Sequence, residues 1–213
     1  MKNTRDSLIE GEILLIDKEL SWTSFDVVKK VKYKLQNHFN IKNLKVGHAG
    51  TLDPLATGLV VLCTGKATKQ INDIQSLEKE YIAIIKLGET TPSFDLETSV
   101  DHQFPIQHIT KDIVINVLDD YKGKLEQIPP VYSAKKYDGK RAYEYARRGE
   151  HIELKAKTVE IREIHLTKFE LPLITLRVVC SKGTYIRALA RDLGISLNSG
   201  ACLVGLERKS IEI

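Results

Sequence analysis

Segments with strand-like and helix-like hydrophobic patterns follow one another irregularly along this chain of 213 residues. Apolar side chains recur at helical spacing within 25–38 and within 110–121, whereas residues 173–181 show the two-residue alternation of a strand. Neither a fixed repeat period nor a low-complexity linker divides the chain. The mixture predicts one α+β domain spanning residues 1–213. Doubly wound parallel folds are disfavoured because GxGxxG and GxxxxGK[ST] are both absent.

The same patterns predict the individual elements. Strands are expected over 12–16, 59–63, 80–87, 158–167 and 173–181. Helices are expected over 25–38, 65–74, 110–121, 141–148 and 184–193. Loops are expected over 47–58, 90–109 and 127–140. Thr23 or Ser24 and Thr110 suit N-caps, and Gly194 is expected to end the last helix.

Composition narrows the class of protein. With 42% hydrophobic and 28% charged residues, the chain has the balance of a soluble globular protein. A net charge of +4 permits an anionic partner such as nucleic acid without requiring one. The three cysteines are far apart and form no CxxC pair, which argues against a disulfide framework or a zinc knuckle. No apolar run approaches the roughly 20 residues that span a bilayer, so a cytoplasmic location is expected.

The segment GHAGTLDPLATG, residues 47–58, is the most unusual in the chain. Pro54 pushes Asp53 toward an extended conformation, and Gly50 and Gly58 permit sharp turns or a close approach by a ligand. Such a loop could hold one carboxylate rigidly at the mouth of a pocket, with His48 near it in sequence. The alternative is an aspartate that caps a turn.

Two further sets of residues suggest a pocket. In SKGTYIR a strand ends, a glycine turn follows, and a helix begins with Tyr185 and Arg187, one of which could meet a base while the other reaches a carboxylate. Tyr81, in the strand KEYIA, shares a face with Ala83 and Ile85. Alternatively, Tyr81 is a core or rim residue, Tyr185 is a core residue and Arg187 is a solvated surface charge.

A basic segment at about 123–150 includes QIPPVYSAKKYDGKRAYEYARRG. Cations and tyrosines are interleaved in it, a pattern that suits contact with phosphates and unstacked bases, although a solvated basic loop would show the same pattern. The histidines lie in different elements and no HExxH is present, so no metal site is predicted. No motif supports a Ser-His-Asp arrangement either.

Together, GHAGTLDPLATG, KEYIA with LGETT, the basic segment, and SKGTYIRALARDLG followed by SGACLVGLER resemble the bacterial TruB family of tRNA pseudouridine-55 synthases. The resemblance runs from Leu15 to Arg208. It implies the pseudouridine synthase fold, with a central mixed, mostly antiparallel sheet flanked by helices and loops. It also implies that the chain isomerises uridine 55 in the T-loop of tRNA, without cofactor or obligate protein partner and as a monomer.

The resemblance also implies roles for single residues. Asp53 matches the essential aspartate, Arg187 the arginine that pairs with it, and His48 the histidine that contacts the flipped nucleotide or the RNA backbone. Tyr81 matches the tyrosine that stacks on the target base, while Tyr185 and Leu206 match residues that line its pocket. RNA contacts are expected, in addition, from Lys18, Lys135, Lys136 and Arg141.

Three departures from the family pattern are present. Its KPxGxTS segment is KELSWTS here, at residues 18–24, which leaves the shape of this loop and the role of Lys18 open. Cys202 and Glu207 stand where histidine and arginine are common, so weaker RNA contacts are expected there. Many relatives continue into a C-terminal RNA-binding domain of the PUA type, and none is expected here before Ile213.

Asp53 is one credible carboxylate, whereas hydrolysis of a glycosidic bond usually takes two. Isomerisation therefore fits the chain better than a nucleoside hydrolase or glycosidase does. Two further functions stay open, namely that of a pseudouridine synthase acting on another RNA and that of a non-catalytic RNA-binding or chaperone protein.

Overall fold

The computed structural model describes residues 4–212, and the chain divides into two compact units. Unit 1 consists of the residues up to Glu80 and those from Leu206 onward, and unit 2 consists of Tyr81–Gly205. The chain passes between the units inside two strands, β4 (Lys79–Leu87) and β12 (Ala201–Ile211). The predicted chain end at Ile213 lies outside the described residues, and the single domain over 1–213 stays a prediction.

Unit 1 is built around the long strand β3. Its elements are α1 (Thr4–Glu10), β1 (Ile13–Lys18), α2 (Ser24–Phe39), β2 (Val46–His48), β3 (Ala56–Thr64), the 3₁₀ helix η1 (Gly65–Gln70) and α3 (Ile71–Ser76). Strands β1 and β2 pair antiparallel with β3, and the end of β12 pairs parallel with its beginning. At that end Gly58 has φ +96°, and a Cβ there would lie 2.4 Å from the carbonyl oxygen of Arg208. Glycine therefore permits the close approach of β12 to β3.

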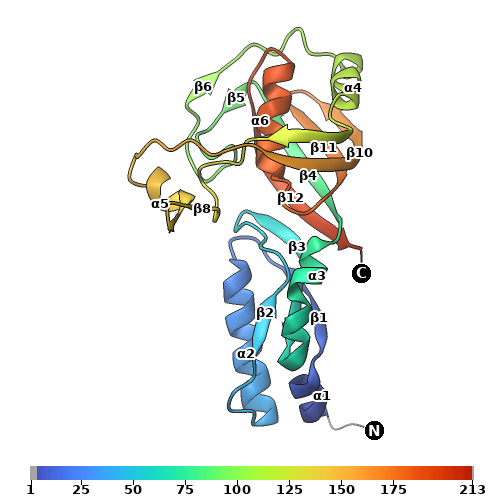
Figure 1. Ribbon diagram of the computed structural model, residues 1–213. Coiled ribbons are helices and arrows are strands. Elements are labelled where there is room, and N and C mark those ends of the chain that lie inside the picture. The colour runs from blue at the N-terminus through green and yellow to red at the C-terminus, as the bar shows by residue number, and fades with distance from the viewer. Residues whose placement is uncertain (1–3, 213) are drawn as a thin grey trace. The chain divides into compact units, whose positions relative to one another are not determined.

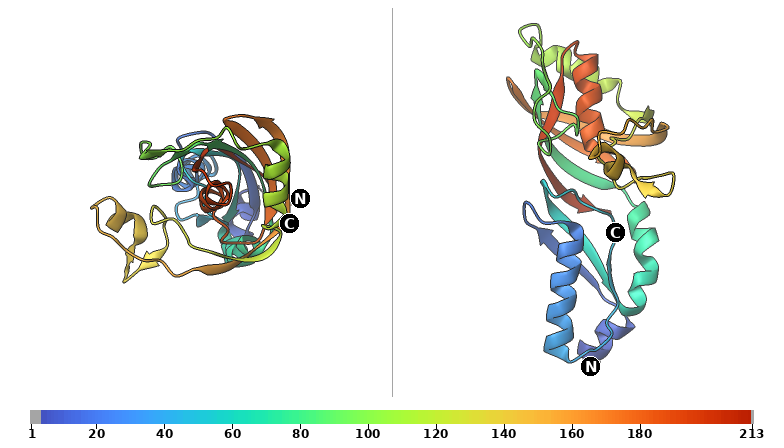
Figure 2. Two further views of the ribbon diagram at one scale, coloured as in Figure 1. Left: turned by 90° about the horizontal axis from the view of Figure 1, so that it is seen from above. Right: turned by 90° about the vertical axis from the view of Figure 1, so that its left-hand side faces the viewer.

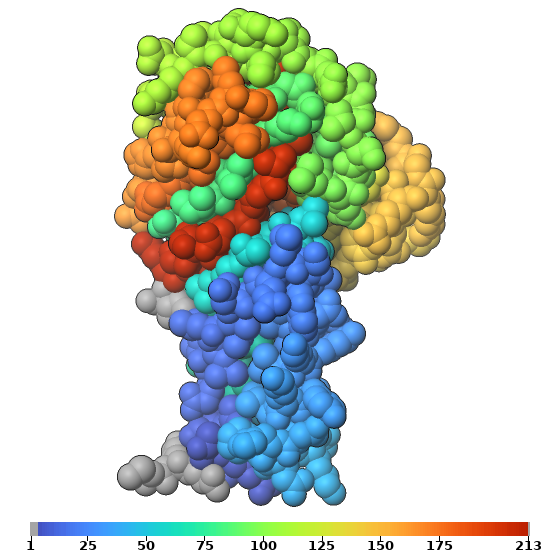
Figure 3. Space-filling view, turned by 180° about the vertical axis from the view of Figure 1, so that it is seen from behind, coloured from blue at the N-terminus to red at the C-terminus, as the bar shows by residue number. Residues whose placement is uncertain are grey.

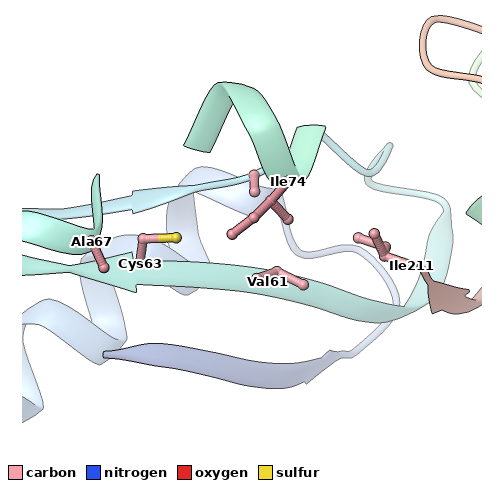
Figure 4. Close-up of a cluster of buried hydrophobic side chains, with 6 residues drawn as sticks. Val61, Cys63, Ala67, Ile74 and Ile211 are labelled. Atoms are coloured by element: carbon pink, nitrogen blue, oxygen red, sulfur yellow. The ribbon is translucent and has the colours of Figure 1, made fainter. Parts of the chain in front are cut away.

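Buried apolar side chains gather in two clusters among those of unit 1. Figure 4 shows the first, in which Val61 and Cys63 of β3 lie near Ala67, Ile74 and Ile211. The second joins α1 to the chain after α2 through Leu8, Ile41 and Leu44. Helix α2 is fixed at its start by a capping box in which Thr23 and Asp26 bond each other's backbone N–H, as the sequence predicted for Thr23.

Unit 2 contains a sheet in the order β4-β11-β10-β7. Its other elements are β5 (Glu89–Thr90), β6 (His102–Gln103), α4 (Lys111–Asp119), β7 (Gly123–Gln127), β8 (Lys136–Tyr137), β9 (Lys140–Arg141), α5 (Ala142–Ala146), β10 (Lys157–Glu170), β11 (Leu173–Cys180) and α6 (Ile186–Ser196). Strand β10 pairs antiparallel with both β11 and β7. Helix α6 lies against this sheet (Figures 1 and 2), and α4 packs on β10 and α6.

Helix α6 differs from its prediction at the C-terminal end. Gly194 was expected to end the helix, which instead continues to Ser196. This position inside the helix requires glycine, because a Cβ there would lie 2.4 Å from the backbone N of Ala201. The requirement for space against a neighbouring strand, rather than for a turn, explains this glycine.

The segment from β8 to α5 stands out from the rest of unit 2 (Figure 3, yellow to orange). It consists of a two-stranded hairpin, in which Lys136 pairs with Arg141, followed by a helix of five residues. The predicted helix over 141–148 is confirmed in a shorter form. The loop predicted over 127–140 is wrong at β8 and at Lys140, because local pairing of the two short strands forms a hairpin there.

Most of the predicted elements are present, and the sheet is mixed and mostly antiparallel, as expected. The sequence missed α1, β2, β5, β6, β7 and β12. The loop predicted over 47–58 is shorter than expected, because β2 includes its first residues and β3 begins at Ala56. Within residues 4–212, none of the helices has the length and apolar character needed to cross a membrane.

Candidate active site

The loop that carries Asp53 is held by its backbone from several directions. The Ser24 hydroxyl at the start of α2 accepts a hydrogen bond from the Leu52 N–H at 2.8 Å and donates to the Leu52 carbonyl at 3.1 Å. The Ser21 N–H donates to the Pro54 carbonyl at 2.8 Å. The Asp53 side chain is only half-buried. The loop therefore fixes the carboxylate while leaving it accessible to solvent.

Lys18 is one of two buried cations behind this loop. It is 1% exposed, and its ammonium donates to the carbonyls of Glu19 at 3.0 Å, Trp22 at 2.7 Å and Pro54 at 3.4 Å. Burial lowers the pKa of Lys18 from its usual value, the charge of Asp53 opposes this shift, and the charge of Arg208 adds to it. Lys18 thus ties the end of β1 to the residue that follows Asp53, and its ammonium points to carbonyl groups of the protein.

Arg208, in β12, is the second buried cation, also 1% exposed. Its guanidinium donates to the carbonyl of Leu59 in β3 at 2.7 Å and to the carbonyl of Gly50 in the loop at 3.2 Å. One planar side chain therefore connects three segments that are far apart in the sequence. The charge of Asp53 interacts with that of Lys18, which in turn lies near the charge of Arg208.

His48 and Leu206 belong to the same unit as Asp53. His48 ends β2 and is half-buried. Burial lowers its pKa, a hydrogen bond with the Gly50 backbone opposes that shift, and the charge of Arg208 adds to it. The imidazole is therefore neutral near pH 7. Leu206 is half-buried and pairs in register with Ala56, three residues after Asp53.

The altered KPxGxTS segment keeps the backbone shape that a glycine would take. Ser21 occupies the glycine position and adopts φ 67°, in the left-handed region. Its N–H bonds the Pro54 carbonyl, as described above, so this conformation directs the segment onto the Asp53 loop. A serine adopts this φ at a higher energy cost than a glycine would.

In unit 2, Tyr81 lies at the start of β4. Its side chain is 9% exposed, and Ala83, Ile85 and Leu87 on the same face of the strand are buried. The predicted common face of Tyr81, Ala83 and Ile85 is therefore confirmed. This burial agrees with the alternative that Tyr81 is a core residue, and its stacking on a base stays a prediction.

Tyr185 is the N-cap residue of α6, and the side-chain amide of Gln127 holds its backbone. The Tyr185 N–H donates to Gln127 Oε1 at 2.8 Å, and Gln127 Nε2 donates to the Tyr185 carbonyl at 3.2 Å. Gln127 is only 1% exposed. Gln127, at the end of β7, therefore fixes the backbone from which the Tyr185 side chain extends. The tyrosine itself is half-buried.

Arg187 lies in the first turn of α6 and is buried. Its guanidinium forms an ion pair with Asp95 at 3.4 Å, with both side chains almost fully buried, and donates to the Tyr132 carbonyl at 3.1 Å. The alternative of a solvated surface charge at Arg187 is therefore wrong. Arg187 is buried because it lies on the inner face of α6, which its position in the sequence did not reveal.

Asp53, His48, Lys18 and Leu206 thus belong to unit 1, whereas Tyr81, Tyr185 and Arg187 belong to unit 2. Sequence reasoning missed four residues that hold them, namely Arg208, Ser24, Gln127 and Asp95. The first three were inside quoted motifs or suggested as caps, but their partners are distant in sequence. Asp95 lies in a stretch without any period, and no signal pointed to it.

The cations of the basic segment differ in their surroundings. Lys136 is exposed, whereas Lys135 donates to the Lys155 carbonyl at 3.1 Å and Arg141 to the Ala134 carbonyl at 2.6 Å. Burial and, secondly, the charge of Lys157 lower the pKa of Lys135. Of the two departures near the C-terminus, Cys202 is fully buried and Glu207 pairs with Lys209 at 2.9 Å.

Unit 1 supplies a half-buried carboxylate and two buried cations, and unit 2 supplies two tyrosine rings and a buried arginine. Within residues 4–212, no three side chains of histidine, cysteine, aspartate or glutamate gather closely enough to hold a metal ion. Chemistry at a carboxylate, as nucleophile or as base, is what these residues can perform.

Comparison with known proteins identifies the family of this chain. The family model described as "TruB family pseudouridylate synthase (N terminal domain)" matches residues 36–186. A protein of Parabacteroides distasonis named tRNA pseudouridine synthase B is 60% identical over 203 residues, covering 95% of this chain and 86% of that protein. Its namesake in Flavobacterium johnsoniae is 50% identical, covering 98% and 91%.

The fold agrees with that of a solved structure. The crystal structure of a Cbf5-Nop10-Gar1 complex contains a chain that matches with a TM-score of 0.73 and 25% identity. The match covers 99% of this chain and 51% of that one, so this chain spans about half of its length. The predicted pseudouridine synthase fold is therefore confirmed, and the chain belongs to the TruB family of pseudouridylate synthases.

Proposed function

We propose that this chain converts one uridine of tRNA to pseudouridine, and that the target is uridine 55 in the T-loop. Relatives that are 50–60% identical are named tRNA pseudouridine synthase B. The observation that carries the proposal is Asp53 itself, a half-exposed carboxylate on a loop whose backbone is fixed by Ser24, Lys18 and Arg208.

The reaction breaks the bond between the uracil nitrogen and the ribose, turns the base, and joins a base carbon to the same sugar carbon. A stacked uridine must first leave its stack, at a cost of a few kcal/mol. Stacking on Tyr81 offsets part of this cost, at about 1–3 kcal/mol per base. Tyr185 and Leu206 then supply apolar walls that retain the uracil while it turns.

Asp53 acts in its ionised form as nucleophile or base. In the family pattern the arginine of GTYIR pairs with this aspartate, and we assign the same role to Arg187 in the RNA-bound enzyme. The ion pair with Asp95 holds the Arg187 guanidinium rigid and reduces the cost of its burial. His48, neutral near pH 7, contacts the flipped nucleotide or the RNA backbone.

A single catalytic carboxylate favours isomerisation over hydrolysis, because glycosidases usually need a second carboxyl group to protonate the leaving group. RNA contacts are assigned to Lys135, Lys136 and Arg141 of the basic segment. We assign Lys18 a positioning role instead, because its ammonium bonds three backbone carbonyls. The enzyme is expected to act as a monomer in the cytoplasm.

The test is incubation of the purified chain with an unmodified tRNA transcript, followed by mass-spectrometric mapping of modified uridines. The proposal expects one pseudouridine, at position 55. A pseudouridine elsewhere would refute the position, and modification of another RNA alone would refute the substrate. Free uracil among the products would indicate a hydrolase. Binding of tRNA without any modification would indicate an RNA-binding protein.

A further inference from the structure

The positive charge of the chain is concentrated in one stretch. Residues 24–45, which comprise α2 and the following turn, contain six lysines and one aspartate, a net charge of +5. The whole chain carries +4, so the remaining residues together carry −1. The modest overall charge therefore conceals a strongly basic helix (Figure 1, α2).

The lysines of α2 lie on the face of the helix that points away from the core. Val27 and Val28 are buried, whereas Lys29, Lys30 and Lys34 are exposed. Lys30 and Lys34 are four residues apart and therefore adjacent on the helix surface, where like charges destabilise a helix by a few tenths of a kcal/mol. An external anion that binds this face would relieve the repulsion.

The charge of Lys29 interacts with that of Asp26, but in the part of the chain that the structure describes neither Lys29 nor its two neighbours on this face form an ion pair at close range. Within residues 4–212, Lys29, Lys30 and Lys34 form no salt bridge. The arginines of the basic segment differ in this respect, because Arg147 pairs with Glu97 at 2.9 Å and Arg148 with Glu150 at 3.5 Å. The exposed lysines of α2 are thus more available for phosphate groups than Arg147 and Arg148 are.

Aromatic rings accompany the lysines on the same face. Phe25 is 58% exposed and Tyr33 is 68% exposed, and they lie four residues on either side of Lys29. The ammonium of Lys29 lies 4.6 Å from the centre of the Phe25 ring, and that of Lys30 lies 4.4 Å from the centre of the Trp22 ring. Interleaved cations and exposed rings are typical of surfaces that bind nucleic acid.

We propose that this face of α2, defined by Phe25, Lys29, Lys30, Tyr33 and Lys34, binds the phosphate backbone of the tRNA substrate. The inference rests on the proposed function for the identity of the RNA. An anionic membrane surface fits less well, because an interfacial helix inserts its apolar face into the lipid, and the apolar face of α2 is buried in the protein core.

The experiment compares two triple variants that lose the same charge. The first carries Lys29→Gln, Lys30→Gln and Lys34→Gln, which keep good helix formers on the surface of α2. The control carries Lys66→Gln, Lys122→Gln and Lys168→Gln, which remove exposed lysines already paired with Glu10, Asp119 and Glu170. Circular dichroism melting confirms that both fold. The dissociation constant for an unmodified tRNA transcript is measured between 50 and 300 mM salt, with single-turnover rates at saturating enzyme.

The proposal expects the α2 variant to bind tRNA at least about tenfold more weakly near physiological salt. The slope of log K against log salt should fall by about 2–3, and the saturating rate should stay at the wild-type value. The control should keep both the affinity and the slope within about twofold, and a variant with three arginines in place of Lys29, Lys30 and Lys34 should restore binding.

Equal tRNA affinity of the α2 variant and the wild type would overturn the inference, as would equal losses in the α2 variant and the control. In those cases, a wild type that still forms pseudouridine leaves the proposed function intact. A wild type that neither binds nor modifies tRNA would overturn both. Loss of binding to phosphatidylserine vesicles by the α2 variant, with tRNA affinity unchanged, would identify a membrane surface as the partner instead.

Discussion

Replacement of Arg208 by methionine tests whether the Asp53 loop is held from behind. The guanidinium is 1% exposed and donates to the Leu59 and Gly50 carbonyls at 2.7 and 3.2 Å. A hydrogen bond from a charged group contributes about 1.5–3 kcal/mol, so the two bonds together contribute about 3–6 kcal/mol. Methionine carries no charge, so the variant avoids the cost of burying one, and this offsets part of the lost free energy. The net loss expected for Arg208→Met is about 2–4 kcal/mol, a decrease in Tm of roughly 5–15 °C.

Arg208→Lys is the matched comparison. An ammonium keeps the charge, but it is a compact donor that cannot reproduce the two-pronged geometry of the guanidinium. It should retain one of the two bonds and lose about 1–2 kcal/mol. The free energy of unfolding of both variants is measured by urea titration with tryptophan fluorescence. The signal reports on unit 1, because Trp22 is the only tryptophan of the chain and its carbonyl accepts a hydrogen bond from Lys18.

Measurement of kcat distinguishes a role of Arg208 in positioning the Asp53 loop from a role in stability alone. At a temperature where all three proteins are folded, displacement of the Asp53 loop by about 1 Å should lower kcat by about 100-fold in Arg208→Met and less in Arg208→Lys. The KM for tRNA should change little, because Arg208 is buried. A methionine variant that unfolds at the wild-type urea concentration and keeps the wild-type kcat would show that Arg208 does not hold the loop.

Three further changes follow from the structure. Ser21→Gly should stabilise unit 1 by about 0.5–1 kcal/mol in urea unfolding, because glycine accepts φ 67° without the cost of a side chain; a destabilised variant would contradict this. Asp95→Asn should destabilise the protein by about 3 kcal/mol and lower kcat, because the buried Arg187 loses its ion pair; wild-type stability and kcat together would speak against this. The pKa of His48 is lowered on folding, so the unfolded chain takes up a proton first as pH falls below about 6.5 and stability decreases there. His48→Gln should flatten this decrease in urea titrations between pH 7.5 and 5, and an unchanged pH profile would exclude the assignment.

The amino-acid sequence predicted the elements whose patterns are local. The helices around Val28 and Val117, the strand of Tyr81 and the cap at Thr23 depend on periodicity and on side chains within four residues. Strand β12 was missed, because its first part is almost entirely buried and shows no alternation. The short strands β5 and β6 depend on a partner about thirteen residues away in sequence, which no local pattern reveals.

Among the residues of the candidate site, too, the sequence revealed those in local motifs and missed those that act over long distances in the chain. Asp53, Tyr81, Tyr185 and Arg187 stand in compact motifs and could be named from the sequence. The residues that fix them act over long distances in the chain, as Arg208 does on Gly50, 158 positions earlier. Lys18 shows the limit most clearly. Its place at the start of the segment that matches KPxGxTS suggested an RNA contact, but only coordinates show that its ammonium is buried against three carbonyls.

The catalytic role of Asp53 can be measured directly. Tritium release from a tRNA transcript labelled at the uridine base is followed for wild type, for Asp53→Asn, and for Asp73→Asn, which alters an exposed aspartate of α3. We expect release by the wild type and by Asp73→Asn, and none by Asp53→Asn, which should still bind tRNA within a few-fold of wild type. Turnover by Asp53→Asn at a rate near that of the wild type would show that this carboxylate is not the catalyst.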